Sequence, residues 1–298
     1  WQILYNDITK GAHMDWIERL NKAMEYLEEH MTEEISYEKA ARIACCSAYH
    51  FQRMFAYMAN VPLSEYIRRR RMSLAAEDLQ SSDEKIVDIA LKYGYASPTA
   101  FNRAFQGVHG VAPSLVKKGN VSVKAYPPIS FTITIKGAVG LDYRIEEKKA
   151  FRVIGVCSPL QAEVEKNFAV VPQLWQQAGS DGSLFKLAGM MDGEPKGILG
   201  VSACNDEEEW KYLICVSSTL PLPEGWEEYL VEAYTWAVFT GTGSCPQAIQ
   251  QLEQRIVTEW LPASGYEYAD GPDIEVYLTP DMQNSSFEVW IPINRKRQ

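Results

Sequence analysis

Two stretches of the chain decide its fold: SAYHFQRMF at residues 47–55 and SPTAFNRAF at residues 97–105. They are offset by 50 residues, and chemically similar residues recur at this offset well beyond both stretches. The matched pairs are Ala40 and Ala90, Ser47 and Ser97, Phe51 and Phe101, Arg53 and Arg103, Phe55 and Phe105, and Val61 and Val111. One structural unit is therefore used twice.

Each copy predicts a short helix, a turn and a second helix, over residues 37–44 and 47–59 and again over 86–93 and 97–109. A serine at the start of each second helix can cap it. The two phenylalanines of each copy are four residues apart, so they share one buried helix face and leave the arginine between them pointing outward. In a helix-turn-helix, side chains at the start of the second helix enter the major groove and bond base edges.

A linking helix is expected between the copies, over residues 62–81, with four consecutive arginines at 68–71. Consecutive helical residues spread around the circumference, so these arginines cannot all face one phosphate. We expect one or two to touch the DNA backbone and the rest to pair with acids or water. A rigid linker would hold the two recognition helices about 34 Å apart, one turn of DNA.

Composition and charge fit two globular domains, of which the first is basic and the second acidic. The net charge is −10, but residues 39–119 hold 12 Lys and Arg against 6 Asp and Glu, whereas residues 120–298 hold 14 against 24. The sequence has no apolar run that could span a bilayer and no secretion signal, and the six cysteines lack the spacing of a disulfide framework or metal site. These features predict a cytoplasmic protein without a membrane partner, metal or cofactor.

The expected domain boundaries follow from this change in charge along the chain. Residues 1–13 look like a cloning leader, because Gly11-Ala-His-Met14 is typical of a cloning junction. Residues 14–119 are expected to form the DNA-binding domain and residues 120–298 the second domain.

The first half resembles the DNA-binding domain of the AraC/XylS family. The motifs that carry the resemblance are Ile43-Ala44, residues 51–55 (FQRMF), residues 62–67 (PLSEYI), Ile89-Ala90, Gly94-Tyr95 and residues 101–105 (FNRAF). The resemblance implies a bacterial transcription regulator that binds double-stranded DNA. It assigns base or backbone contacts to Tyr49, His50, Gln52 and Arg53 in the first unit, and to Thr99, Asn102 and Arg103 in the second. Any one of these can instead be a solvated helix residue.

The second half predicts an α+β domain. Alternating and β-branched stretches predict strands at residues 130–136, 151–157, 198–204, 212–218, 230–240, 274–278 and 287–293. Helices are expected at residues 167–178 and 246–261. The order strand, helix, strand, strand therefore occurs twice, which suggests a duplicated unit and an antiparallel sheet with helices on one face and a free face for a ligand cleft.

The last two strands indicate what could line that cleft. Alternate strand residues point to opposite sides, so Glu275 lies with Tyr277, and Glu288 lies with Trp290. If the apolar residues pack on the helices, both pairs line the free face. Carboxylates beside aromatic rings would suit a lipophilic cation. The alternative is that both glutamates simply face solvent.

The second half also resembles the GyrI-like effector-binding domain, in residues 171–175 (VPQLW), 271–277 (GPDIEVY) and 287–293 (FEVWIPI). The resemblance implies a cleft for diverse, often cationic and aromatic compounds, with a buried glutamate at the position of Glu275. Candidate aromatic walls are Trp175, Tyr143, Tyr212, Trp236 and Trp290, each of which can instead be an ordinary core residue.

The leading hypothesis is a DNA-binding transcription regulator of multidrug-response type. A small-molecule effector would change its DNA affinity or its contact with RNA polymerase. No nucleophile triad, metal set or phosphate loop is evident, so no catalytic residue is assigned. Two alternatives stay open: a GyrI-like domain that hydrolyses small molecules, with Glu275 as general base, and a second domain that only docks a protein partner.

Overall fold

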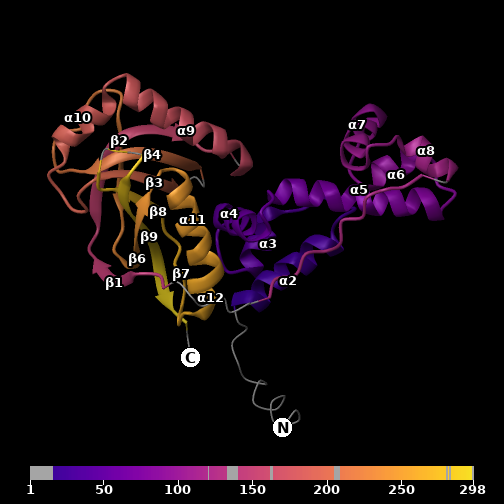
Figure 1. The fold of residues 1–298 in the computed structure, drawn as a ribbon, viewed down its shortest axis with the longest axis horizontal. Coiled ribbons are helices and arrows are strands. Elements are labelled where there is room, and N and C mark those ends of the chain that lie inside the picture. Colours follow the sequence, from indigo (N-terminus) through magenta and orange to yellow (C-terminus); the bar gives the residue numbers. More distant parts are fainter. Residues whose placement is uncertain are drawn as a thin grey trace, which may run out of the picture. The chain divides into compact units, whose positions relative to one another are not determined.

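The computed structural model describes residues 16–119, 121–132, 140–161, 164–204, 209–279, 281 and 283–296. The chain divides into two compact units, a helical one over residues 14–132 and a second one from residue 133 onward. Figure 1 shows the first as helices only and the second as a sheet with helices. None of the helices in the described ranges is both long and apolar enough to cross a membrane.

The helical unit contains both copies of the repeat. Its helices are α2 (Trp16–Glu29), α3 (Tyr37–Ile43), α4 (Ala48–Ala59), α5 (Leu63–Ser81), α6 (Ile86–Lys92), α7 (Pro98–His109) and α8 (Pro113–Lys118). In Figure 1, α5 runs between the two helix-turn-helix pairs, α3–α4 and α6–α7. The predicted double helix-turn-helix is confirmed.

The caps and core of each copy are those that the repeat predicts. Ser47 and Ser97 accept hydrogen bonds from backbone N–H groups at the starts of α4 and α7. Phe51 and Phe55 are fully buried, as are Phe101 and Phe105. Burying a phenylalanine side chain is worth about 1.5–3 kcal/mol, so these rings are a main source of each unit's stability.

Residues 121–132 belong to the helical unit, beyond the boundary expected from composition. They form neither helix nor strand, and they hydrogen-bond to the helices instead. Asn21 donates to the carbonyl of Phe131 at 2.9 Å and accepts from its N–H at 2.8 Å, and the Phe131 ring packs edge-on against Phe55. The strand expected at residues 130–136 is therefore absent over 130–132, and its remainder lies outside the described residues.

The second unit is built on one antiparallel sheet. Its strands are β1 (Tyr143–Lys148), β2 (Phe151–Pro159), β3 (Ile198–Cys204), β4 (Trp210–Ser217), β5 (Glu227–Val231), β6 (Tyr234–Gly243), β7 (Tyr266–Tyr268), β8 (Asp273–Tyr277) and β9 (Ser285–Arg295). The order is β1-β6-β9-β8-β3-β4-β2-β5, with β7 paired to β9. The predicted strand at 230–240 is two strands, β5 and β6.

The duplication appears in this order as two matching halves that meet between β3 and β8. One half reads β3-β4-β2-β5 and the other β8-β9-β6-β1. In the chain, each half has its own helices after one strand and before the next two of that half. Helices α9 (Val164–Ser180) and α10 (Ser183–Met190) lie between β2 and the pair β3 and β4, and α11 (Gln247–Arg255), η1 (Ile256–Trp260) and α12 (Leu261–Ala263) lie between β6 and the pair β8 and β9. The predicted α+β architecture is confirmed.

The helices pack on the face of the sheet that carries Glu275, not on the opposite one. Trp260 of η1 packs against Phe239, and Phe239 and Glu275 both pair across to Val289, so all three strand residues share that face. The apolar residues Ile274 and Val276 belong to the opposite face, in a buried cluster drawn from seven strands. The expectation that this apolar set packs on the helices is wrong.

Candidate functional site

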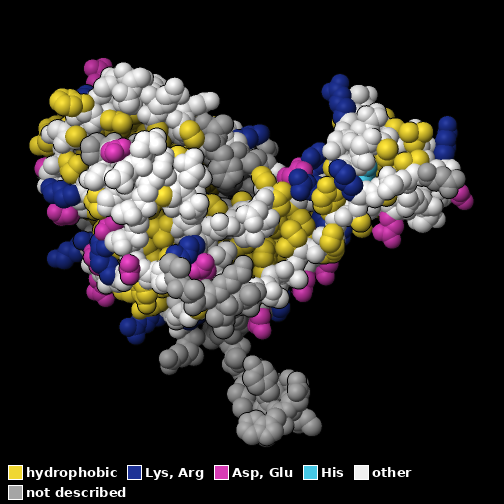
Figure 2. All heavy atoms as spheres, viewed as in Figure 1, with side chains coloured by type: hydrophobic (Ala, Val, Ile, Leu, Met, Phe, Trp, Pro, Cys, Tyr) yellow, Lys and Arg dark blue, Asp and Glu magenta, His cyan; other side chains and the backbone are white. Residues whose placement is uncertain are grey.

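The second recognition helix, α7, presents the residues expected to contact DNA. Thr99, Asn102 and Arg103 are all exposed, opposite the buried Phe101 and Phe105. Figure 2 shows Lys and Arg side chains in dark blue at the α7 end of this unit and over α5. This helix face can meet the major groove as it stands.

The residues expected to contact DNA from α4 lie differently. Tyr49, His50 and Gln52 are buried, and Arg53 is half-buried with its guanidinium 5.6 Å from the centre of the Tyr57 ring. His50 Nδ1 lies 2.9 Å from the Ser47 hydroxyl. The Gln52 amide donates to the carbonyl of Ala48 at 3.3 Å. DNA contact through α4 therefore stays a prediction.

The arginine run on α5 is tied into the helical unit itself. Arg68 and Arg69 both bond Glu65 on the same helix, each at 2.6 Å. Arg70 pairs with Glu28 of α2 at 2.6 Å, and Arg71 donates to backbone carbonyls of the α2–α3 loop. We expected one or two of the four to touch DNA phosphates. Each also has a partner within the protein, and contact with DNA phosphates stays a prediction; Arg68 and Arg69 keep 39% and 37% of their side chains exposed.

Four of the expected effector-site residues form one cluster on the helix-covered face of the sheet. Glu275 Oε2 accepts hydrogen bonds from the hydroxyls of Tyr212 at 3.0 Å and Tyr277 at 2.8 Å. The Trp175 indole N–H, on α9, donates to the Tyr212 hydroxyl at 3.0 Å, and its ring packs edge-on against Tyr277 at 4.8 Å. We call these four residues the Glu275 cluster.

Burial and charge distinguish this cluster from an ordinary core. Tyr212 and Tyr277 are buried, whereas Glu275 and Trp175 are only half-buried. Burial raises the pKa of both tyrosines well above the usual value, and the nearby Glu275 raises it further. The phenols are therefore neutral donors, which orient the carboxylate without cancelling its charge.

The other expected residues do not join this cluster. Glu288 pairs across with Val276, so it lies on the opposite face from Glu275, together with Trp290 and Trp236. There Arg144 donates to both Glu288 oxygens, at 2.8 and 3.2 Å, and the Trp290 indole donates to Oε2 at 2.7 Å. The single cleft expected to contain both glutamates is therefore not formed, because the strand register places the two carboxylates on opposite sides.

Tyr143 is also separate. It lies half-exposed on the edge strand β1, where its ring contacts Phe239 and Trp260. It shares the helix-covered face with Glu275, but β6 and β9 lie between their strands.

Sequence reasoning missed two residues of the Glu275 cluster's surroundings. Glu253 of α11 is a carboxylate with only 4% of its surface exposed, and its charge contributes to the raised pKa of Tyr212. It sits among Ile249, Leu252 and Ile256 on the buried face of its helix, and a charged residue on such an apolar stripe was the available signal. Gly200 lies directly across from Glu275 and makes room for the Tyr212 hydroxyl.

Known proteins match both units. Residues 144–293 match the family of the integron-associated effector binding protein, and residues 40–119 match the helix-turn-helix domain family. The chain belongs to the AraC-type helix-turn-helix regulators that carry a C-terminal GyrI-like effector-binding domain. It is a DNA-binding transcription regulator.

Individual relatives fit this assignment. The transcriptional activator AarP of Providencia stuartii is 35% identical over 98 residues, which are 33% of this chain and 73% of AarP. The regulatory protein SoxS of Salmonella typhimurium is 34% identical over 103 residues, 35% of this chain and 94% of SoxS. Both relatives are regulatory proteins by name, and AarP is a helix-turn-helix transcriptional activator.

Among solved structures, SAV2435 bound to tetraphenylphosphonium is similar to this chain at 18% identity. The match covers 51% of this chain and 94% of that one, with a TM-score of 0.45.

Proposed function

We propose that the effector of this regulator is a lipophilic cation that binds at the Glu275 cluster. The carrying observation is a half-buried carboxylate held by two neutral phenols beside an indole ring. Aromatic faces attract cations by about 0.5–2 kcal/mol, and a carboxylate with limited access to water supplies the opposite charge. Glu288 is the poorer candidate because Arg144 already pairs with it.

We further propose that the bound cation alters DNA affinity or the contact with RNA polymerase. Either outcome requires that the cation favour one conformational state of the chain over another. The cation would do so by competing for the Glu275 carboxylate, which would free the Tyr212 hydroxyl and, through it, the Trp175 indole of α9. Displacement of α9 is then the first structural consequence of binding.

The binding test uses tryptophan fluorescence of the full chain, titrated with tetraphenylphosphonium and with a neutral aromatic of similar size. We expect Glu275→Gln to weaken binding of the cation at least about tenfold, or about 1.4 kcal/mol, and to leave binding of the neutral compound nearly unchanged. The matched control is Glu288→Gln, on the opposite face, which should change neither. Equal affinity of the wild type and Glu275→Gln for the cation would reject this site.

A further inference from the structure

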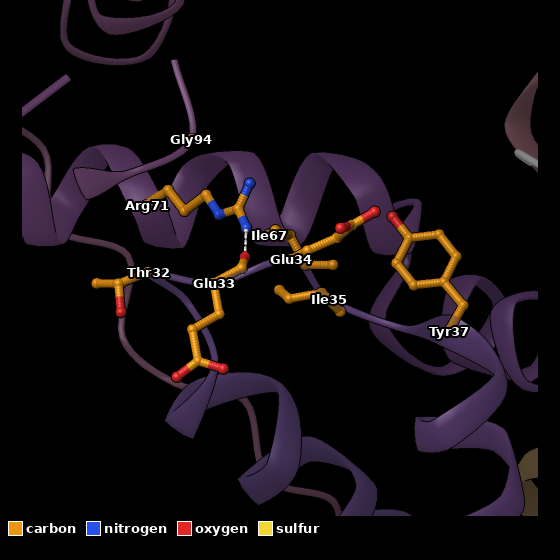
Figure 3. Close-up of a pocket in the computed structure, with 8 residues that line it drawn as sticks. All are labelled: Thr32, Glu33, Glu34, Ile35, Tyr37, Ile67, Arg71 and Gly94. Atoms are coloured by element: carbon orange, nitrogen blue, oxygen red, sulfur yellow. Dashed lines mark hydrogen bonds between the residues drawn. The ribbon is translucent and has the colours of Figure 1, made fainter. Parts of the chain in front are cut away.

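A pocket of about 430 Å³ lies where the two helix-turn-helix units meet along α5 (Figure 3). The α2–α3 loop and the start of α3 supply one wall, α5 supplies the floor, and the turn that follows α6 supplies the far side. The lining residues are Thr32, Glu33, Glu34, Ile35, Tyr37, Ile67, Arg71 and Gly94. The pocket is thus lined by both copies of the repeat.

One side chain, Arg71, crosses this junction. Its Nε donates to the carbonyl of Met31 at 2.9 Å, and its Nη2 donates to the carbonyl of Glu33 at 2.6 Å, the bond dashed in Figure 3. Its remaining nitrogen, Nη1, faces Gly94, where a Cβ atom would lie only 3.2 Å from it. A single planar guanidinium therefore bonds the loop before the first helix-turn-helix and lies beside the turn inside the second.

Two neighbouring arginines differ from Arg71 in what they bond. Arg68 lies beside Gly107 of α7, but it bonds Glu65 on its own helix and not the α2–α3 loop. Arg69, two residues earlier, bonds Glu65 one turn away on its own helix and stacks over Tyr126. It reaches neither the α2–α3 loop nor α6 or α7 through these contacts. Arg69 has the same chemistry and the same helix but lacks the bridge, which makes it the matched control.

We propose that Arg71 is a positioning residue for DNA recognition, which fixes the second recognition helix, α7, at a set distance and orientation from the first helix-turn-helix. Two recognition helices read successive major grooves only if their spacing matches one turn of the duplex. For this role the planar shape of the Arg71 guanidinium matters more than its charge, because lysine has the charge but cannot donate in parallel to two carbonyls from one planar group. This role does not depend on which effector the chain binds.

The direct test measures the distance between the two units in the full chain. Spin labels on a ketone-bearing amino acid would be placed at two exposed positions, Arg42 of α3 and Gln106 of α7. We expect one narrow distance distribution in the wild type and in Arg69→Met, and a broadened or shifted one in both Arg71→Met and Arg71→Lys. Unchanged distributions in the Arg71 variants, with wild-type helicity by circular dichroism, would overturn the proposal.

A second readout uses DNA and separates positioning from a phosphate contact. The probes are the duplex that the wild type enriches from a random library and the same duplex with one half-site scrambled. We expect Arg71→Met to lose at least about tenfold in affinity for the original duplex and less than about threefold for a duplex with one half-site scrambled. Rescue by Arg71→Lys, with a smaller salt dependence in Arg71→Met, would show a phosphate contact instead.

A pair of glycines tests the same contact from its other side. Gly94 and Gly110 both have positive φ, +82° and +77°, but a Cβ at Gly110 would meet nothing within 4 Å. Substitution by alanine strains both backbones alike, and only Gly94→Ala presses on Arg71. We expect Gly94→Ala to broaden the distance distribution and Gly110→Ala to leave it unchanged; equal effects would count against the bridge.

Discussion

Gly200 is the residue on which the geometry of the Glu275 cluster depends most closely. It lies on β3 opposite Glu275, and a Cβ there would be 2.2 Å from the Tyr212 hydroxyl and 2.9 Å from Glu275 Oε2. Glycine at this position lets the Tyr212 hydroxyl of β4 and the Glu275 carboxylate of β8, the two strands on either side of β3, meet above it. The hydrophobic pattern of β3 gave no indication of this, because a glycine in a strand is compatible with a bulge, a bend or a close approach.

We predict that Gly200→Ala destabilises the chain by about 1–3 kcal/mol, the usual range for overpacking, and abolishes binding of tetraphenylphosphonium. Thermal unfolding and a fluorescence titration would measure the two effects. Gly189→Ala is the matched control, because a Cβ at Gly189 has nothing within 4 Å and the residue lies within helix α10. An alanine at 200 that binds the cation normally would show that the cluster's geometry is unimportant.

Glu253 extends the site's negative charge onto α11. Because it is buried and acts on Tyr212, we predict that Glu253→Gln weakens binding of a dication more than binding of a monocation. Glu259→Gln is the control, since Glu259 is more exposed and pairs with Arg255. Titration calorimetry with one monocation and one dication of similar aromatic area would measure the difference, and an equal loss for both would contradict a direct role.

At the scale of elements, the pairing between strands determines which side chains of different strands share a face of the sheet. Alternation within one strand does not determine this. Alternation correctly predicted that Glu275 lies with Tyr277 and that Glu288 lies with Trp290. It could not say whether the two pairs share a face, because a shift of one residue in register moves every side chain of a strand to the other side. The observed pairing of Val276 with Glu288 separates them.

The segment 121–132 is an element that the sequence did not reveal. It forms neither helix nor strand, and hydrogen bonds from its backbone to side chains of the helical unit hold it. Among them, the N–H of Lys124 donates to His109 Nδ1 at 3.2 Å, while His109 Nε2 lies 3.0 Å from the carbonyl of Met72. These two contacts fit the neutral imidazole with its proton on Nε2, because a proton on Nδ1 would oppose the Lys124 N–H.

The pKa of His109 is lowered below its ordinary value of 6.5, mainly by burial. Below about pH 6.5, His109 therefore binds a proton in the unfolded chain but not yet in the folded chain. The free energy of unfolding falls as the pH drops through this range, and it levels off below the pKa of the folded state. We predict that His109→Gln reduces this loss. Urea unfolding of both proteins at about pH 7.5 and about pH 5.5 would measure it, and identical pH dependence would exclude His109 as its source.

The exposed face of α7 carries the prediction for DNA. We expect Arg103→Ala to cost about 1–3 kcal/mol of binding to the selected site if Arg103 contacts a base, and to relax preference at the contacted position. If it contacts only a phosphate, affinity should fall alike for all sequences. Competition binding with single-base variants of the site distinguishes the two, and an unaltered affinity would remove Arg103 from the interface.

For the whole molecule, the repeat made the first half the easier one to predict from sequence. Two aligned copies give independent support to each capping serine and each buried phenylalanine, and all of them occupy the predicted places. In the second half the strand-helix-strand-strand order was enough for the architecture. The site was not fully predictable from the sequence. It depends on the register between β8 and β9, on Gly200, which permits the close approach of Tyr212 and Glu275, and on Glu253 of α11.

The central claim is that a cation at the Glu275 cluster controls a DNA-binding regulator. The most direct test is the affinity of the full chain for its selected duplex, by fluorescence anisotropy, together with transcription from the same site, each with and without tetraphenylphosphonium. We predict that the compound changes affinity or transcription for the wild type and for Glu288→Gln, and changes neither for Glu275→Gln. Equal DNA affinity and equal transcription with and without the bound compound in the wild type would contradict the claim.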